Sequence, residues 1–483
     1  MNKISKIENI MIFIIFIPLL FIDRTHFGVD IFWLLKHGKI IIEQGFINTV
    51  PLTIHNDLNF VMQQWLSSTI LYNLSNILGE IGIYLYIYLF SLINILLIYK
   101  ILSEISQNKN TNICLTFVFS ILFCIRYAFA RPQLISYTII LLTLLLCEKY
   151  VKTNKIKYLI PIPFLAIIQI NAHATMWVYM FCILGIYIFN LKIFKTKNLI
   201  DDIYNKIPII ITFIISLFCL FINPYKVDMI LYVFKSNSSL LQYISAEMQP
   251  SSLSNEGIIL FLILFIIAIL LYKLKSKIKL RFLILLLGGT ILSLLNVRNL
   301  IMFLIATTIF LSYFIKDIDS EKIMEKIFGV YNITIPIIII FAFIIRFINI
   351  QNFSTDCNIE KNINIKNIAN IILTDKDYTE NSTVYNSTQS IGSLLEEYNI
   401  NVYMDTRGEI YLESINNKKD ILNEYLMLEY FGRIDVNTFL EEYNFDYLVL
   451  HDTSVVKDYT DKYKLIFVEN NENNTLIYLY KKL

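Results

Sequence analysis

The residue types best able to do chemistry first gather in a polar loop, residues 23–64, which follows the first apolar segment. The loop contains Asp30, in the sequence Val-Asp-Ile-Phe-Trp, and three of the five histidines. A carboxylate beside long apolar segments is a candidate for proton transfer. Asp30 also precedes a predicted amphipathic helix over 31–42, where its side chain could cap the backbone and favour the helix dipole. The sequence leaves both roles open.

Short polar motifs between later apolar segments carry the other candidates. Arg131 and Arg298 stand out because a guanidinium is a planar fork that binds phosphate or carboxylate through two hydrogen bonds, which lysine cannot do. Each could instead anchor a helix end at a membrane surface. His173 lies in Asn-Ala-His and Glu247 in Glu-Met-Gln-Pro. Plain turn chemistry or an interfacial position would also explain these two residues.

Apolar segments must position these motifs. Hydrophobic residues make up 56% of the 483 residues and charged residues 17%, with a mean hydropathy of +0.58. A soluble domain of this size exposes more charge, so the composition indicates a mainly α-helical polytopic membrane protein. A membrane span needs about 20 apolar residues, and about eleven segments approach that length. They are 8–22, 82–103, 112–128, 133–150, 157–171, 174–194, 207–222, 257–274, 280–296, 298–316 and 329–349.

Basic residues predict the orientation of these spans. The segment Trp65 to Leu78 is short and interrupted by serine and asparagine, so we interpret it as an interfacial helix. Alternate connections then carry more than twice as many Lys and Arg residues as the others. The positive-inside rule places this basic set in the cytoplasm, with the N-terminus inside and the C-terminus outside.

This orientation places the chemistry-bearing side chains on one side. All five histidines and all three tryptophans fall outside. Among the eight basic residues of the outer connections before the last span, four are arginines, whereas Arg281 is the one arginine in the basic cytoplasmic connections. These four are Arg24, Arg126, Arg131 and Arg298. Their distribution predicts an anion-binding region at the outer face.

The composition changes after residue 349, where acidic and polar residues become more frequent. Strand-like segments there alternate with helical ones, a pattern that predicts a small extracytoplasmic α/β domain over 350–483. Residues 1–349 form the transmembrane domain, with a first outer loop over 23–64 and interfacial helices to about residue 79. The expected strands are Thr383–Asn386, Asn401–Asp405, Tyr447–His451, Leu465–Glu469 and Leu476–Tyr480. The expected helices are Gln389–Tyr398 and Lys419–Phe431.

Taken in order, the outer motifs resemble bacterial polytopic glycosyltransferases of the GT-C fold, and more specifically their poorly characterised membrane-protein relatives. The resemblance covers nearly the whole chain and depends on the order of short motifs. These are Asp30-Ile-Phe-Trp-Leu-Leu-Lys-His-Gly38, Gln63-Gln-Trp-Leu66, Arg131-Pro-Gln-Leu-Ile-Ser-Tyr137, Gln169-Ile-Asn-Ala-His173, Asn223-Pro-Tyr225, Glu247-Met-Gln-Pro250, Asn296-Val-Arg-Asn299 and Val402-Tyr-Met-Asp-Thr-Arg407.

The resemblance implies a multi-pass protein of the bacterial cytoplasmic membrane that transfers a sugar from a polyprenyl-phosphate donor. The acceptor would be an envelope glycan, lipid or protein at the outer face. Asp30 matches the catalytic base of that fold, and a cationic group would stabilise the departing phosphate. Membrane lipid is an expected partner and nucleic acid is not. The candidate substrate-binding residues are Gln64, Trp65, Arg131, Asn171, His173, Glu247 and Arg298.

Two departures from the family pattern bear on the mechanism. Asp30 has no acidic neighbour, and Gln63 and Gln64 stand before Trp65 where relatives often carry an acidic residue or histidine. No metal ligands are therefore predicted, and a requirement for a divalent metal is open. A catalytically silent envelope scaffold and a polymerase or ligase of lipid-linked glycans are the alternatives. A transporter would favour ionisable residues near the bilayer midplane, and the predicted spans contain almost none.

Overall fold

The computed structural model describes residues 15–22, 30–188, 206–251, 279–315, 365–470 and 475–483. The described residues are mainly helical, with 66% helix, 7% strand and a small C-terminal sheet. It divides into two compact units, each built from separate stretches of sequence. We call them the bundle unit (15–22, 63–188, 206–233, 242–251 and 279–315) and the sheet unit (30–62, 234–241, 365–470 and 475–483).

The first loop belongs to a different unit from the one expected from the sequence, which placed it with the transmembrane domain. Residues 30–62 fold with the C-terminal residues in the sheet unit and are separate from the bundle unit. Backbone hydrogen bonds explain this association: the N–H of Ile54 donates to the carbonyl of Val402 at 3.0 Å, and the N–H of Val402 to the carbonyl of Leu52 at 3.1 Å. The expected boundary at 349/350 lies outside the described residues.

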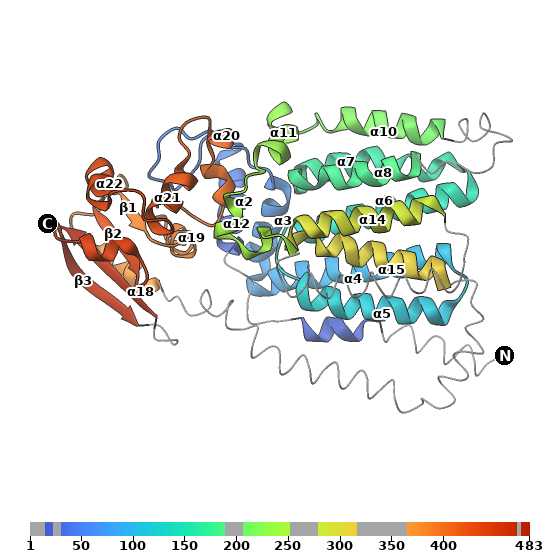
Figure 1. Ribbon diagram of the computed structural model, residues 1–483, viewed down its shortest axis with the longest axis horizontal. Coiled ribbons are helices and arrows are strands. Elements are labelled where there is room, and N and C mark those ends of the chain that lie inside the picture. Colours follow the sequence, from blue (N-terminus) through green and yellow to red (C-terminus); the bar gives the residue numbers. More distant parts are fainter. Residues whose placement is uncertain (1–14, 23–29, 189–205, 252–278, 316–364, 471–474) are drawn as a thin grey trace, which may run out of the picture. The chain divides into compact units, whose positions relative to one another are not determined.

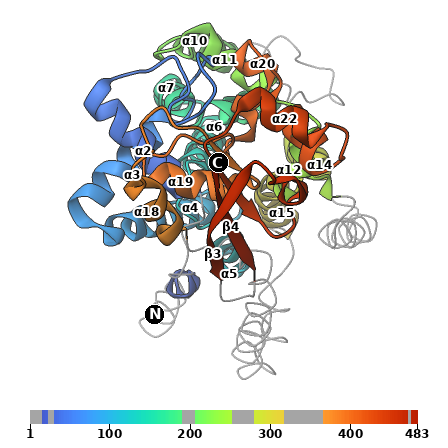
Figure 2. The same ribbon diagram turned by 90° about the vertical axis from the view of Figure 1, so that its left-hand side faces the viewer.

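The bundle unit consists of helices that run side by side in Figure 1 and are seen nearly end-on in Figure 2. Its main helices are α3 (Trp65–Leu78), α4 (Glu80–Ile105), α5 (Lys109–Arg126), α6 (Gln133–Thr153), α7 (Pro161–Ala172), α8 (Trp177–Ile188), α10 (Ile207–Cys219), α14 (Leu280–Leu295) and α15 (Leu300–Ile315). Short 3-10 helices are η1 (Ile17–Phe21), η2 (Ile156–Tyr158), η3 (Ala174–Met176), η4 (Ala246–Met248) and η6 (Val297–Asn299). Two further helices, α11 (Val227–Lys235) and α12 (Leu241–Ile244), cross the boundaries between the units.

Three segments of the bundle unit are long and apolar enough to cross a membrane: Glu80–Ile105, Gln133–Thr153 and Val297–Phe314. Four shorter apolar segments accompany them: Ile156–Ala172, Ala174–Ile188, Ile207–Cys219 and Leu280–Leu295. The described residues thus contain three candidate spans, fewer than the eleven or so expected. The expected spans 257–274 and 329–349, and parts of 8–22 and 174–194, lie outside the described residues.

Buried polar side chains form hydrogen bonds between the apolar helices. On α4, the amide of Asn94 donates to the carbonyl of Leu134 at 3.2 Å and accepts from the hydroxyl of Thr138 at 2.9 Å, both on α6. The hydroxyl of Ser312 on α15 donates to Asn112 on α5 at 3.2 Å. Such bonds stabilise helix pairs where water is excluded, because an unsatisfied polar group there is costly.

Close backbone approach joins α14 to α15. A Cβ added at Gly289 would lie 2.9 Å from the carbonyl oxygen of Met302 and 3.0 Å from the Cβ of Ala306. The neighbouring Gly288 has no atom within 4 Å of the same position. Small residues at helix contacts are typical of membrane bundles, since packing drives their association.

The sheet unit places helices around a four-stranded sheet in the order β1-β2-β4-β3. β1 (Val384–Asn386) is parallel to β2 (Tyr447–His451), and β4 (Leu476–Lys482) is antiparallel to both β2 and β3 (Tyr463–Asn470). Its helices are α2 (Asp30–Gln44), α18 (Lys366–Thr374), α19 (Gln389–Glu397), α20 (Glu413–Asn416), α21 (Ile421–Glu429), α22 (Val436–Tyr443), η7 (Gly408–Tyr411) and η8 (Val455–Tyr459).

Four of the five expected strands form. The exception is Asn401–Asp405, which makes only isolated bridges from Val402 to Thr53 and to Val384. Ladder pairing stops there because the side chain of Asn386 forms hydrogen bonds with the backbone of Tyr403 and Met404. In addition, the side chain of Asp405 belongs to a buried ion cluster. The core around Ile391 and Val449 also receives Phe32 of α2, so the first loop contributes to this domain.

The α14–α15 contact predicts the effect of two alanine substitutions. Gly289→Ala forces the carbonyl of Met302 away and should destabilise the bundle by about 1–3 kcal/mol, the usual cost of overpacking. Gly288→Ala, the matched control, should leave stability unchanged or raise it, because alanine favours helix by up to about 1 kcal/mol. Thermal unfolding of the detergent-purified chain measures both. Equal melting temperatures for the two variants would contradict the close approach.

Candidate functional site

Three of the candidate residues meet at one end of the bundle unit. Arg131 lies in the connection before α6, Arg298 in η6 and Glu247 in η4. Arg131 donates from its terminal nitrogen to Oε1 of Glu247 at 2.6 Å, and Arg298 donates from Nε to Oε2 at 3.4 Å. One carboxylate thus bridges two guanidinium groups, and we call these three side chains the arginine cluster.

Local hydrogen bonds hold the connections that carry this cluster. The hydroxyl of Tyr86 on α4 donates to the carbonyl of Arg131 at 3.0 Å. The N–H of Val297 donates to the carbonyl of Gln249 at 2.9 Å, which fixes η4 against η6. The hydroxyl of Ser251 donates to the carbonyl of Ser293 at 2.5 Å. These bonds bring residues from three distant connections to one place.

The charges of the arginine cluster favour binding of a further anion. Burial works to raise the pKa of Glu247, but Arg131 and then Arg298 outweigh it and lower that pKa to about 2. Glu247 is therefore ionised at neutral pH, and the three side chains carry one net positive charge. Their exposed fractions are 30%, 37% and 42% for Arg131, Arg298 and Glu247, so a ligand can reach them. Each guanidinium has five N–H donors, more than a shared carboxylate can accept.

His173 lies buried in the neighbouring connection between α7 and α8. Its Nδ1 is 3.4 Å from the hydroxyl of Ser136, and its Nε2 is 3.1 Å from the hydroxyl of Thr175. Burial, and then the charge of Arg298, lower the pKa of His173 to about 3. The imidazole is thus neutral at physiological pH. Its hydrogen bonds stabilise the connection between α7 and α8.

Trp65 and Asn171 bond to each other. The indole N–H of Trp65 donates to Oδ1 of Asn171 at 2.7 Å, and Nδ2 of Asn171 donates to the carbonyl of Ile222 at 2.8 Å. These two hydrogen bonds connect α3 and the end of α7 to the residues after α10. Gln64 precedes α3 without a side-chain cap bond, and its side chain is partly exposed.

Asp30 belongs to the other unit. It is the first residue of α2 in the sheet unit, is partly buried, and accepts a hydrogen bond from the indole N–H of Trp33 at 3.4 Å. One face of α2 is buried, including Trp33, Leu34 and His37. The structure therefore brings together Arg131, Glu247 and Arg298, with His173 nearby, and assigns Asp30 to a separate compact unit.

A buried ion cluster holds α2 within the sheet unit. Arg407 donates from Nε to Asp405 at 2.9 Å and from a terminal nitrogen to Glu396 on α19 at 2.9 Å. Its other terminal nitrogen is 2.6 Å from Nε2 of His37 on α2. Since a guanidinium only donates, Nε2 of His37 accepts and the imidazole is neutral. Tyr411 completes the buried cluster by donating to Asp405 at 2.6 Å.

Opposite pKa shifts follow from this arrangement. Burial and the Arg407 charge lower the pKa of His37 well below its usual range. Burial raises the pKa of Glu396 well above its usual range, against the pull of Arg407 and with the help of Asp405. Burial also works to raise the pKa of Asp405, but Arg407 outweighs it and lowers that pKa. Asp405 therefore balances the charge of Arg407, while Glu396 and His37 are neutral.

Sequence reasoning did not single out the charged side chains of this cluster. Asp405 and Arg407 lie in a motif that the resemblance used, and their spacing of two residues was the available signal. Nothing in the sequence linked them to His37, which is 370 residues from Arg407. Among the described residues, no group of three His, Cys, Asp or Glu side chains is arranged to hold a metal ion.

Comparison with known proteins adds no family. No protein-family model and no curated protein matches this sequence.

The ion cluster of the sheet unit predicts two opposite changes with pH. Between pH 6.5 and 5.5, unfolding lets His37 take up a proton, so acid destabilises the fold through His37. Folded Glu396 holds a proton that the unfolded chain releases, so acid stabilises the fold through Glu396. Over this range, we expect acid to stabilise His37→Gln relative to the unmodified protein and to destabilise Glu396→Gln relative to it.

Hydrogen–deuterium exchange of the α2 and α19 amides, corrected for the intrinsic exchange rate at each pH, measures these free energies. Glutamine preserves an acceptor for Arg407 at both positions, so packing changes little. Parallel pH dependences in all three proteins would contradict the assigned protonation states.

Proposed function

We propose that this protein is a membrane glycosyltransferase that moves a sugar from a polyprenyl-phosphate donor to an envelope acceptor at the outer membrane face. The observation that carries the proposal is the convergence of Arg131 and Arg298 on Glu247 at one end of an apolar helical bundle. Two partly exposed guanidinium groups that share one carboxylate suit a phosphate that is attached to a lipid.

The chemistry of transfer assigns a role to each group. A base takes the proton from the acceptor hydroxyl as its oxygen attacks C1 of the sugar from the face opposite the phosphate. The bond from C1 to the phosphate oxygen breaks, and its electron pair stays on the departing polyprenyl phosphate. Arg131 and Arg298 stabilise that negative charge, because fixed donors aimed at a developing charge lower the barrier. Asp30 is the proposed base, from its place in the outer motifs.

Glu247 has a positioning role in this proposal. Its carboxylate holds the two arginines side by side in the absence of substrate and lowers the repulsion between them. When a lipid phosphate binds, the phosphate oxygens take over part of the hydrogen bonding from Glu247. The arginines then need little rearrangement, which lowers the entropic cost of binding.

Two alternatives differ from this proposal. A polymerase or ligase of lipid-linked glycans would use the same arginines without Asp30. A catalytically silent envelope scaffold is favoured by the burial of α2 in the sheet unit, where His37 bonds to Arg407. In a scaffold the first loop would serve only to build the sheet unit.

Substitution of Asp30 separates these functions. We expect Asp30→Asn to lower sugar transfer by about 10²–10⁴-fold, the usual contribution of a general base, with unchanged protein abundance. The matched control is Asp57→Asn in the same loop, where the side chain is exposed. Transfer of radiolabelled sugar from polyprenyl-phosphate donors into membranes is the measurement. Full activity of Asp30→Asn would remove Asp30 as the base and leave the polymerase or ligase, whereas absence of transfer by the unmodified protein would leave the scaffold.

Substitution of Arg298 tests the phosphate site without knowledge of the sugar. Arg298→Lys keeps the charge but loses the planar fork, so we expect the affinity for undecaprenyl phosphate to fall about tenfold. Arg126→Lys, at the end of α5 and outside the arginine cluster, should bind as the unmodified protein does. Titration of the purified chain in detergent, followed by intrinsic fluorescence, gives both constants. Equal affinities would count against a phosphate site at the arginine cluster.

A further inference from the structure

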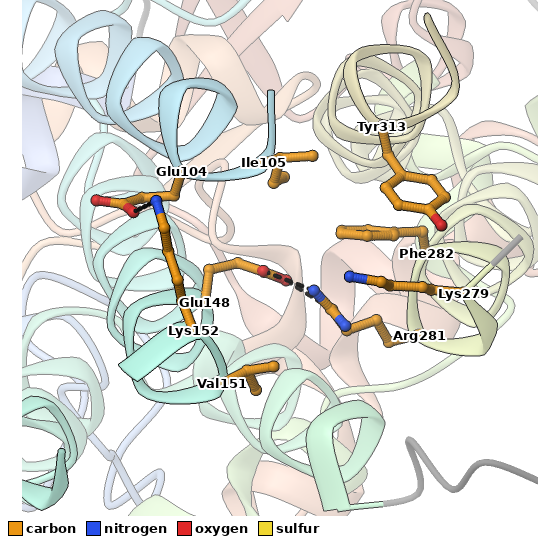
Figure 3. Close-up of a pocket in the computed structure, with 9 residues that line it drawn as sticks. All are labelled: Glu104, Ile105, Glu148, Val151, Lys152, Lys279, Arg281, Phe282 and Tyr313. Carbon is orange, nitrogen blue, oxygen red and sulfur yellow. Dashed lines mark hydrogen bonds and ion pairs between the residues drawn. The ribbon is translucent and has the colours of Figure 1, made fainter. Parts of the chain in front are cut away.

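A cavity of about 150 Å³ lies at the other end of the bundle unit, where α4, α6 and α15 end and α14 begins. Figure 3 shows the nine lining side chains around it. They come from all four helices or the residue before α14: Glu104, Ile105, Glu148, Val151, Lys152, Lys279, Arg281, Phe282 and Tyr313. None of these residues takes part in the arginine cluster.

A buried ion pair forms one wall of this cavity. Arg281 donates from Nε and from a terminal nitrogen to the two oxygens of Glu148, each at 2.8 Å. The hydroxyl of Tyr187 on α8 donates to the same carboxylate at 2.7 Å. The side chains of Arg281 and Glu148 are only 7% and 5% exposed. This wall is therefore rigid, and its two charges cancel.

The mouth of the cavity is basic. Lys152 is 48% exposed and pairs with Glu104 at 2.8 Å, and the exposed Lys279 lies 5.7 Å from the ring centre of Tyr313. Two lysines, one arginine and two carboxylates line the cavity. Ile105, Val151 and Phe282 supply apolar surface beside these charges. Charged and apolar surfaces side by side suit a ligand that has both characters.

The surroundings make this end of the bundle unit basic as a whole. Lys149 and Lys157 lie 5.7 Å and 5.2 Å from the ring centre of Tyr158, in and after the last turns of α6. The positive-inside rule predicts that this end faces the cytoplasm. The cytoplasmic leaflet carries anionic lipids, and basic pockets between membrane helices on that side bind their headgroups.

We propose that this cavity binds a phosphate group, supplied by the headgroup of an anionic phospholipid. Lys279 and Lys152 face the phosphate at the mouth, and the apolar residues contact the start of the acyl chains. A cavity of about 150 Å³ has room for a phosphate group. The site is separate from the proposed glycosyl transfer and does not depend on it.

Lipid binding by the full-length chain in detergent tests this inference. Native mass spectrometry should detect one tightly bound dioleoyl phosphatidylglycerol and no comparable binding of dioleoyl phosphatidylcholine. Lys279→Gln should weaken phosphatidylglycerol binding about fivefold, the effect of one lysine near an anionic lipid. Lys157→Gln is the matched control, a lysine at the same end but outside the cavity, and should weaken binding much less than Lys279→Gln does. Arg281 is kept, because its removal would leave Glu148 buried without its cation.

A further binding measurement with inorganic phosphate distinguishes a lipid headgroup from free phosphate as the source of the bound phosphate group. Phosphate that binds with the same dependence on Lys279, and competes with phosphatidylglycerol, supports the cavity as the phosphate site. Phosphate that binds this way while phosphatidylglycerol does not would overturn the lipid as the source. Equal losses in Lys279→Gln and Lys157→Gln would overturn the site, because general electrostatic attraction would then explain the binding. Equal binding of the two lipids would overturn it as well.

Discussion

The buried guanidinium of Arg407 joins parts of the chain that are 370 residues apart, and the sheet unit depends on it. A buried charge without partners would cost several kcal/mol, so the fold must supply them. Asp405 and Glu396 come from the C-terminal segment, whereas His37 comes from the first loop. Trp33 and Phe60, also in that loop, contact the guanidinium with ring centres at 6.0 Å and 5.9 Å. The first loop can therefore reach its native state only together with residues at the end of the chain.

The same constraint explains why the ion pairs of the bundle unit differ in role. Arg281 and Glu148 are nearly inaccessible and satisfy each other through two hydrogen bonds, so they fix the positions of α6 and α14. Breaking such a pair by removal of one partner costs about 3–5 kcal/mol. The arginine cluster is accessible and has an excess of positive charge. A pair that is closed to solvent stabilises the fold, and an accessible cluster with two guanidinium groups can bind an anion.

The proposed functions follow from this distinction. The accessible arginines suit a lipid-linked phosphate, and the basic cavity at the other end of the bundle unit suits a phospholipid headgroup. Both ligands are lipids that carry phosphate, yet the sites use different side chains. The arginine cluster uses two planar guanidinium groups, which hold a phosphate in a defined orientation. The cavity presents lysines at its mouth, which attract a headgroup with less demand on its geometry.

The sequence alone determined which segments become helices and strands. The apolar segments around 82–103 and 133–150 became α4 and α6, and four of the five C-terminal strands formed where alternation and turn residues indicated them. These elements are encoded locally, by the spacing of apolar residues and by breakers such as Gly79, whose φ of +61° separates α3 from α4. The resemblance also named Arg131, Glu247 and Arg298 as separate candidates, but could not say which of them touch.

Only the tertiary structure decided the partners. That Glu247 bridges two arginines, that Arg281 pairs with Glu148, and that His37 accepts from Arg407 all depend on side chains brought together across long stretches of sequence. The segment Asn401–Asp405 has strand-like residues, yet its pairing is limited to isolated bridges because Asp405 serves the buried cation. Local preference is a matter of tenths of a kcal/mol per residue, whereas an unpaired buried charge costs several, so the long-range partners decide such segments.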